Sequence, residues 1–267
     1  MSDGAHTHED VIHLPENSWY PFILAIGIGM LPFGAISIFW DGTFGPVLLT
    51  FGAIGALIGM GGWAHAMIKE KSNPHTAHEY KWLKQSVLLL LVSETAIFGA
   101  LFVHHFYARW HFAQWPPVGA PEIPVRLPAI ATLLLMTSSI TCEFAHRNLI
   151  ANQKRKSLLW LAATIILGVA FLTMQAFEYG FLYTFDKFTL NSGTFGTSFF
   201  IMTGFHGLHV AIGLVLLLVV FFRMWMGHFE ADRHFSFLAA SWYWHFVDII
   251  WIFLFGTIYL LSARIVA

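Results

Sequence analysis

Residues 204–226 read GFHGLHVAIGLVLLLVVFFRMWM. The run is long enough to cross a membrane as a helix, because about 20 apolar residues span the hydrocarbon core of a bilayer. Its polar side chains are His206 and His209 near one end and Arg223 near the other. This stretch therefore predicts a transmembrane helix that carries two imidazoles within its length.

A second apolar run also carries polar side chains in its interior, and residues 242–248 read WYWHFVD. An Asp at the centre of a bilayer costs about 2.5–3.5 kcal/mol on insertion scales. Side chains such as His245 and Asp248 are therefore expected to face protein, water or a lipid headgroup rather than acyl chains.

The composition is that of an integral membrane protein. Of the 267 residues, 57% are hydrophobic and only 11% are charged, whereas a soluble domain carries about a quarter charged residues. The formal net charge is −1, and no stretch is rich in Lys and Arg, which argues against a nucleic-acid partner. The single cysteine, Cys142, lies in an apolar segment and is interpreted as a packed small residue.

Seven apolar segments predict seven transmembrane helices and an all-α, polytopic membrane fold. In lipid, continuous apolar runs of this length can satisfy their backbone only as helices. None shows the alternating pattern of about ten residues that marks a membrane β-barrel strand. The predicted spans are Phe22–Trp40, Val47–Ile68, Leu83–Tyr107, Pro128–Asn148, Leu158–Phe181, Phe199–Met226 and Phe237–Leu261.

The basic residues predict that the N-terminus lies inside and the C-terminus outside. Inner loops are enriched in Lys and Arg, and this orientation places most of the basic residues on the inner side. The inner set is Lys69, Lys71, Lys81, Lys84, Arg147, Lys154, Arg155, Lys156, Arg223 and Arg233, and the outer set is Arg109, Arg126, Lys187 and Arg264.

A charged loop that contains Asn73-Pro74 predicts a division of the chain. We expect an N-terminal cytoplasmic segment over residues 1–20 and a two-helix unit over 21–68. A cytoplasmic linker over 69–82 and a five-helix bundle over 83–267 follow. The first 17 residues contain acidic side chains and no Lys or Arg, so a cleaved signal peptide is not expected.

Glu94 lies about eleven residues into the third predicted span, roughly 16 Å along the helix axis and near mid-membrane. A carboxyl group at that depth suits a proton relay, an ion site or a contact to bound lipid. The alternative is a carboxyl group that only hydrogen-bonds to a neighbouring helix. A functional role is favoured, because the hydroxyls of Ser93 and Thr95 would suffice for structural bonding.

His206 and His209 are three residues apart and share one helix face. Ligation of a heme would need a second helix, and His245 is the available partner. Structural histidines, packed where nearby glycines let helices approach closely, are the favoured interpretation. His245 and Asp248 have the same spacing, and we interpret them as a polar pair in an aromatic packing surface.

Further ionisable residues lie near the predicted helix ends. Arg223 and His228 flank the inner end of the sixth span, where cations meet lipid phosphates or simply extend toward water. Glu178 is expected near the outer interface, within reach of water. Glu143 and His146 share a face and are expected to form a local pair.

Several segments, in the right order, resemble subunit III of the heme-copper cytochrome c oxidases. They cover nearly the whole chain, and the last two in the chain are highly specific. The segments are Val92-Ser93-Glu94, Trp115-Pro116-Pro117, Leu172–Tyr179, Phe199–His209 and Ala240–Asp248.

This resemblance implies a V-shaped, phospholipid-binding cleft between helices one and two and helices three to seven. It implies that Glu94 lies beside the lipids, that Arg223 and His228 contact headgroups, and that Trp63 matches a cleft tryptophan. In the family, subunit III holds no heme or copper, which lie in subunits I and II. The implied role is to support proton uptake and sustained turnover of subunit I, in contact with subunits I and II and within a respiratory supercomplex.

The chain departs from the usual family pattern at Leu238, where a glutamate is common, and at Ala131, where an asparagine is common. The run Thr141–His146 also differs from the usual one. These departures favour a divergent bacterial oxidase, and hence the bacterial plasma membrane over the mitochondrial inner membrane.

Other functions stay open at the level of sequence. Close alternatives are the equivalent subunit of a quinol oxidase, which usually has two helices fewer, or of a nitric oxide reductase. From other classes, the chain could be a b-type membrane cytochrome that uses His206 or His209 with His245. It could also be an ion-coupled transporter with Glu94 as its carrier site.

Overall fold

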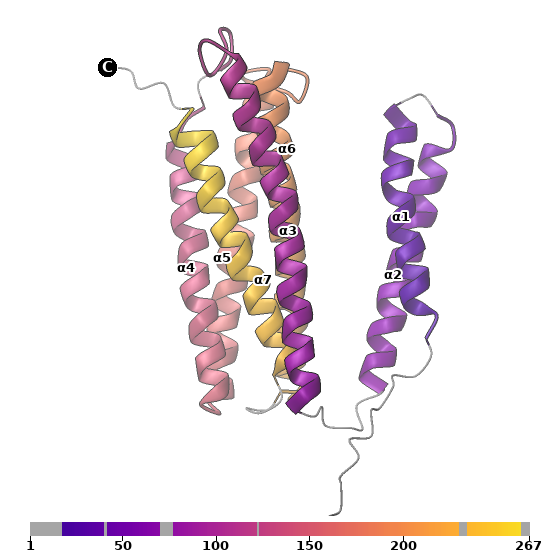
Figure 1. Ribbon diagram of the computed structural model, residues 1–267. Helices are drawn as coiled ribbons and strands as arrows, with labels where there is room; N and C mark the ends of the chain where they lie inside the picture. Colours follow the sequence, from indigo (N-terminus) through magenta and orange to yellow (C-terminus); the bar gives the residue numbers. More distant parts are fainter. Residues whose placement is uncertain (1–17, 40–41, 70–76, 122, 230–233, 263–267) are drawn as a thin grey trace, which may run out of the picture. The chain divides into compact units, whose positions relative to one another are not determined.

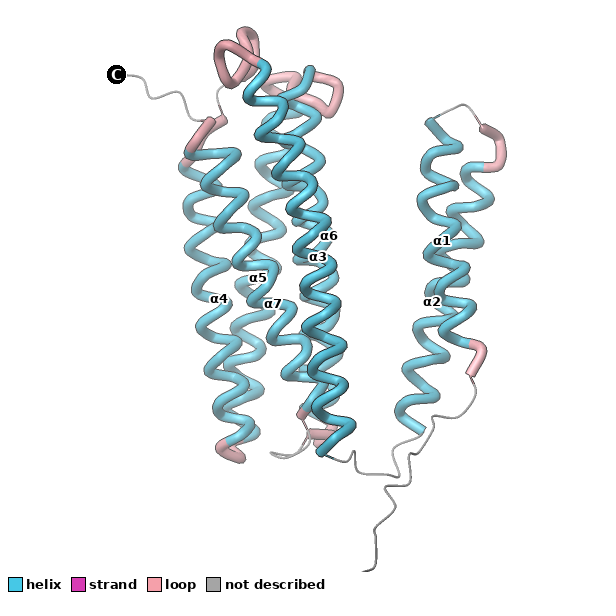
Figure 2. Tube along the Cα trace, viewed as in Figure 1, coloured by secondary structure: helices cyan, strands magenta, loops and turns pink. Residues whose placement is uncertain are grey.

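The computed structural model describes residues 18–39, 42–69, 77–121, 123–229 and 234–262. Within these ranges the chain forms seven α-helices and one short π-helix, and no strand (Figures 1 and 2). The α-helices are α1 (Tyr20–Phe39), α2 (Gly45–Lys69), α3 (Ala77–His111), α4 (Arg126–Ile150), α5 (Lys154–Thr184), α6 (Gly193–Trp225) and α7 (Phe235–Leu254), and the π-helix is η1 (Phe255–Leu260).

All seven α-helices are long and apolar enough to cross a membrane. This confirms the predicted all-α fold with seven spans, while the orientation of the termini and the V-shaped cleft stay predictions. The third helix begins at Ala77, before the predicted Leu83, because the polar residues that precede the apolar run are also helical. Residues 70–76 of the predicted linker lie outside the described residues.

The chain divides into two compact units, residues 1–77 and 78–267. In the first unit, α1 and α2 pack on each other through glycines. A Cβ atom placed on Gly27 would lie 2.4 Å from the backbone nitrogen of Ala56, and one on Gly59 would lie 2.5 Å from that of Leu24. Such close backbone approach gives membrane helices extensive van der Waals contact, which stabilises their association in lipid, where the hydrophobic effect does not.

In the second unit, α4–α7 pack on one another, with contacts of α4 to α5, α5 to α6, α6 to α7 and α4 to α7. Helix α3 joins them through side chains. The ring of Phe98 lies 5.1 Å from that of Phe205 on α6 and 6.3 Å from that of Phe246 on α7. The ring of Phe102 lies 6.4 Å from that of Phe253 on α7.

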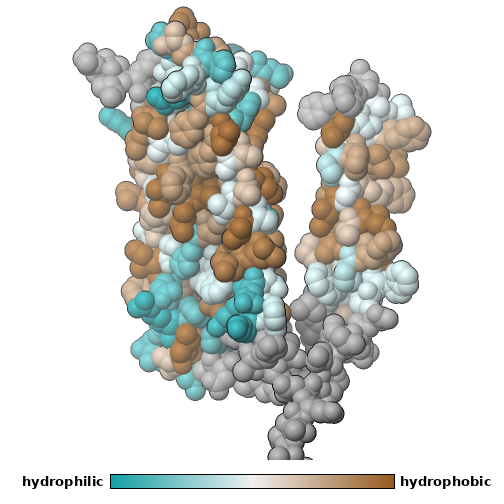
Figure 3. All heavy atoms as spheres, in the orientation of Figure 1, coloured by the Kyte–Doolittle hydropathy of each residue, from teal (hydrophilic) through white to brown (hydrophobic). Residues whose placement is uncertain are grey.

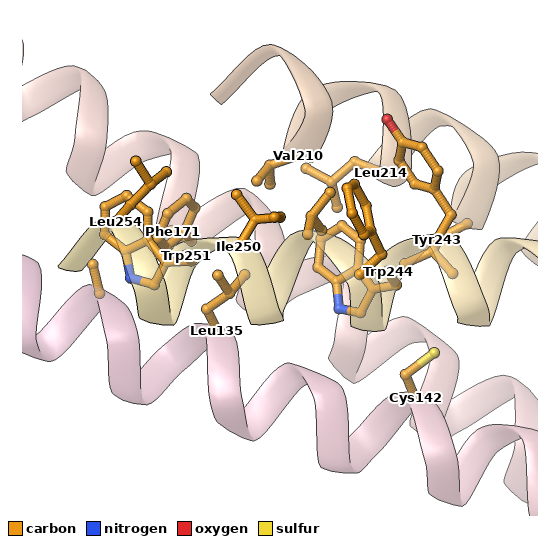
Figure 4. Close-up of a cluster of buried hydrophobic side chains, with 14 of the residues drawn as sticks. Leu135, Cys142, Phe171, Val210, Leu214, Tyr243, Trp244, Ile250, Trp251 and Leu254 are labelled. Carbon is orange, nitrogen blue, oxygen red and sulfur yellow. The ribbon is translucent and has the colours of Figure 1, made fainter. Parts of the chain in front are cut away.

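The core of the second unit is built around the tryptophans of α7. Figure 4 shows Trp244 and Trp251 beside side chains of α4, α5 and α6. A Cβ atom on Gly168 of α5 or on Gly213 of α6 would lie 2.7 Å or 2.9 Å from the Trp244 indole. The Trp244 Nε1–H donates to Ser138 Oγ of α4 at 3.0 Å. Cys142 is fully buried here, as the sequence predicts for a packed small residue.

Hydrophobic side chains dominate the middle of the second unit on the face drawn in Figure 3, and hydrophilic side chains gather toward its two ends. Large apolar residues on this unit are strongly exposed, including Leu89 at 71% and Val103 at 69%. Apolar exposure of this extent suits contact with acyl chains or with other membrane subunits. The surface therefore agrees with a membrane-spanning bundle.

Candidate functional site

Helices α3 and α6 bring together two ionisable residues that lie 115 positions apart. Glu94 Oε2 is 3.2 Å from His209 Nε2. The His209 side chain is only 7% exposed and that of Glu94 is 22% exposed. We define these two residues as the Glu94–His209 pair. The sequence did not predict it, because Glu94 was expected to contact lipid and His209 to pack between helices.

The hydrogen bonds of His209 show that this pair contains a proton. Its Nδ1 lies 2.8 Å from the carbonyl oxygen of Phe205. Because a carbonyl oxygen only accepts, Nδ1 must donate its hydrogen. The contact between Nε2 and Glu94 Oε2 then needs a second hydrogen, on an imidazolium or on a carboxylic acid. The pair therefore links α3 to α6 through a hydrogen bond between two ionisable side chains.

Aromatic rings surround the imidazole of His209. The Phe205 ring lies 4.5 Å away and the Phe98 ring 5.0 Å away, and the Tyr243 ring is parallel to the imidazole at 6.4 Å. The hydroxyls next to Glu94 contribute no contact to it. Ser93 donates to the Leu90 carbonyl oxygen and Thr95 to that of Leu91, within α3.

A cationic site lies at the end of α6. Arg223 Nη1 donates to Ser236 Oγ of α7 at 2.9 Å, and its guanidinium carbon lies 5.0 Å from the centroid of the Phe229 ring. His228 is exposed, and its backbone N–H donates to the Arg223 carbonyl oxygen at 2.9 Å. Two neighbouring side chains that can carry positive charge at a helix end suit an anionic headgroup.

Trp63, on α2 in the first unit, is 42% exposed.

The other histidines singled out from the sequence have different neighbours. His206 is fully buried and stacks on Trp251 with ring centroids 5.0 Å apart, and the Phe171 ring is perpendicular to it at a centroid distance of 6.0 Å. His245 Nδ1 contacts Ser139 Oγ of α4 at 2.5 Å. Among the described residues, no group of three or more His, Cys, Asp or Glu side chains could hold a metal ion.

The expected pair of His245 and Asp248 does not form. Asp248 is 3% exposed and makes no hydrogen bond to His245 within the described ranges, and the polar group that faces its carboxyl is the Ser139 hydroxyl of α4. The reason is that the His245 ring turns toward α4, where the Ser139 hydroxyl is available. The spacing of three residues between His245 and Asp248 predicts that both lie on one helix face. It cannot predict that Ser139 on another helix would bind His245.

Two further expectations were wrong. Glu178 does not reach water, because it is 6% exposed and accepts a hydrogen bond from the Tyr259 hydroxyl at 2.9 Å. Glu143 pairs with Arg147 at 2.6 Å, whereas the His146 ring lies 5.2 Å from that of His234. The spacing of four residues between Glu143 and Arg147 is a signal that the sequence did contain.

Comparison with known proteins identifies the family of this chain. The family model of cytochrome c oxidase subunit III matches residues 10–263. The chain belongs to this family. Cytochrome c oxidase subunit 3 of Patiria pectinifera is 35% identical over 93% of this chain and 96% of its own length. The subunit of Formosania lacustris is 36% identical over 97% and 98%, and that of Papio hamadryas 34% identical over 95% and 98%.

Membership in the cytochrome c oxidase subunit III family confirms the identification made from the sequence motifs. Proteins of this family are subunits of an enzyme complex of the respiratory chain, and this chain is a multi-pass membrane protein. The relatives named above are eukaryotic mitochondrial proteins, so the bacterial origin expected from Leu238 and Ala131 stays a prediction.

Proposed function

We propose that this chain is the accessory subunit III of a proton-pumping heme-copper terminal oxidase that passes electrons from cytochrome c to oxygen. The observation that supports this most strongly is the family match over residues 10–263. Electron transfer and oxygen reduction take place in partner subunits I and II, which carry heme and copper. This chain is not itself catalytic and stabilises subunit I during sustained turnover and proton uptake.

The proposal includes phospholipid as a bound partner. Arg223 supplies positive charge for a phosphate group at the end of α6, where its guanidinium rests on the buried Phe229 ring, and the exposed His228 can donate a hydrogen bond to the same group. Glu94, 22% exposed and held by His209, lies beside the lipid within the membrane. The resemblance adds Trp63 on α2, which is 42% exposed, to the proposed lipid-binding residues.

The location proposed for the complex is the bacterial plasma membrane, where it can join a respiratory supercomplex. The departures at Leu238 and Ala131 support this choice. A b-type cytochrome is less well supported, because His206, His209 and His245 contact Trp251, Glu94 and Ser139 respectively and do not face a common site.

Purification of the tagged chain in mild detergent tests the main proposal. The expected result is co-purification of two further membrane subunits that contain heme and copper, with oxygen consumption driven by reduced cytochrome c. Isolation of the chain alone with one heme per polypeptide would overturn the proposal. So would substrate-driven proton flux in vesicles that contain only this chain.

Arg223→Ala tests the lipid assignment separately. One basic side chain near an anionic surface contributes about 1 kcal/mol, so the variant complex is expected to retain less phospholipid through purification. Lys154→Ala, which removes an exposed cation at the start of α5, is the matched control and should retain the normal amount. Equal phospholipid content in both variants, measured by mass spectrometry, would remove Arg223 from the site.

A further inference from the structure

A cavity of about 580 Å³ lies beside the last two turns of α5. Pro124, just before α4, and Leu127, in its first turn, line one side, and Gly180 and three phenylalanines of α5 and its C-terminal end line the other. Its volume falls within the range of about 300–1,000 Å³ that small-molecule sites occupy. Its lining includes none of the residues of the phospholipid site proposed above, so the two sites are distinct.

A buried carboxyl group forms part of the cavity lining. Glu178 is 6% exposed, and its Oε2 accepts the hydrogen bond from Tyr259 on η1. Its Oε1 is buried and has no hydrogen-bond partner in the part of the chain that the structure describes. A buried polar atom without a partner destabilises the protein, because it has lost its hydrogen bonds to water. Among the lining residues, Glu178 therefore carries a buried oxygen that the described part of the protein leaves without a partner.

The rest of the cavity is apolar and aromatic. Phe177, Phe181 and Phe185 follow one another at intervals of four residues and are 71%, 49% and 71% exposed. The rings of Phe181 and Phe185 lie 5.0 Å apart. Phe185 directly follows the last residue of α5, and Glu178 lies six residues before that helix end, or about 9 Å along the axis. The carboxyl group is therefore near the membrane interface, with apolar surface around it.

We propose that this cavity binds a hydrophobic molecule whose head is a neutral hydroxyl group, such as a quinol or a sterol. Glu178 Oε1 accepts the hydrogen of that hydroxyl group, a bond that a head without a donor hydrogen cannot make. The apolar lining favours a neutral head over an ammonium or a phosphate. The three phenylalanine rings contact the apolar body of the ligand.

Photolabelling of the protein, purified with its native partners and placed in phosphatidylcholine nanodiscs, tests this site. The probe is a long-chain phenol with a diazirine in its alkyl tail, and its methyl ether is the matched probe without a donor hydrogen. The phenol is expected to label the peptide over residues 176–185 about tenfold more than the ether, as one buried hydrogen bond allows. Equal labelling by the two probes, or none, would overturn the proposal, and none is the result expected if a partner subunit fills the cavity.

Two variants separate the carboxyl group from the cavity. Glu178→Leu removes the acceptor, and Gly180→Leu fills the cavity from a position where an added Cβ meets open space. Each should reduce phenol labelling by about tenfold, and each tests the site if the other fails to assemble. Glu143→Gln, on a different carboxyl group that pairs with Arg147, should label as the unchanged protein does. Full labelling in Gly180→Leu would contradict the site.

Competition identifies the class of natural ligand. Unlabelled decyl-ubiquinol and cholesterol are added separately before illumination. Displacement by the quinol supports a phenolic head, and displacement by cholesterol supports an aliphatic alcohol. Failure of both to displace the probe would overturn the proposal.

Discussion

At the scale of single residues, the Glu94–His209 pair shows how a polar group is accommodated inside a membrane bundle. His209 Nδ1 is committed to the Phe205 carbonyl oxygen, so one proton must lie between Nε2 and Glu94 Oε2. His209 therefore gives Glu94 a hydrogen-bond partner within the bundle in place of bulk water. The pair replaces the hydration that each group would lose on insertion.

Glu94→Gln tests this role because an amide can donate to Nε2 but cannot pass a proton on. The variant is expected to assemble normally and to reduce oxygen normally in its first turnovers, with lower lipid retention or earlier loss of activity. An oxygen electrode trace and lipid mass spectrometry measure these effects. Loss of oxygen reduction from the first turnover, with the hemes intact, would show that Glu94 acts directly in the chemistry.

Ser138→Ala probes a second buried contact. It removes the acceptor of the Trp244 Nε1–H, which stays buried, so we expect a loss of about 1–3 kcal/mol in the free energy of unfolding. For a chain of this size that corresponds to roughly 2–12 °C in the thermal midpoint. Thr137→Ala is the control, because its exposed hydroxyl bonds only to the Leu133 carbonyl oxygen within α4. Equal midpoints for the two variants would contradict the assignment.

At the scale of helices, α1 and α2 depend on glycines at their contact. Gly27→Ala places a methyl group 2.4 Å from the Ala56 backbone nitrogen, whereas Gly29→Ala meets nothing within 4 Å. We expect the first variant to force the helices apart and to lower stability by about 1–3 kcal/mol. The second should be neutral or slightly stabilising, since Ala favours helix over Gly. Thermal unfolding in detergent compares them, and a more stable Gly27→Ala variant would argue against close packing.

The helices also show what the sequence could and could not predict. Apolar run length predicted all seven spans, because the bilayer fixes that length. The contacts between helices were not predictable from spacing along one helix. Glu94 meets His209 and Glu178 meets Tyr259 only because α3 packs on α6, and because η1 turns the end of the last span toward α5. A π-helix of this kind leaves no periodic signal in the sequence.

At the scale of the whole molecule, the distribution of basic residues predicts the orientation of the chain across the membrane. Neither the helices nor the family match tests this orientation. It places the loop between α4 and α5 inside and the loop between α3 and α4 outside. Single cysteines at Gln153 and Val118 report on these two loops, since both positions are exposed. Native Cys142 is fully buried and gives no background with a membrane-impermeant maleimide.

In right-side-out membrane vesicles, Val118→Cys is expected to react without permeabilisation and Gln153→Cys only after it. The physical reason is that translocating Lys154, Arg155 and Lys156 across the bilayer is costly, so their loop is retained on the inner side. Inverted vesicles should give the opposite pattern, which controls for shielding of either cysteine by a neighbouring subunit. If Gln153→Cys reacts first in right-side-out vesicles, the chain is inverted. Arg223 and His228 would then face outer-leaflet phosphates, and Glu178 would lie near the inner surface.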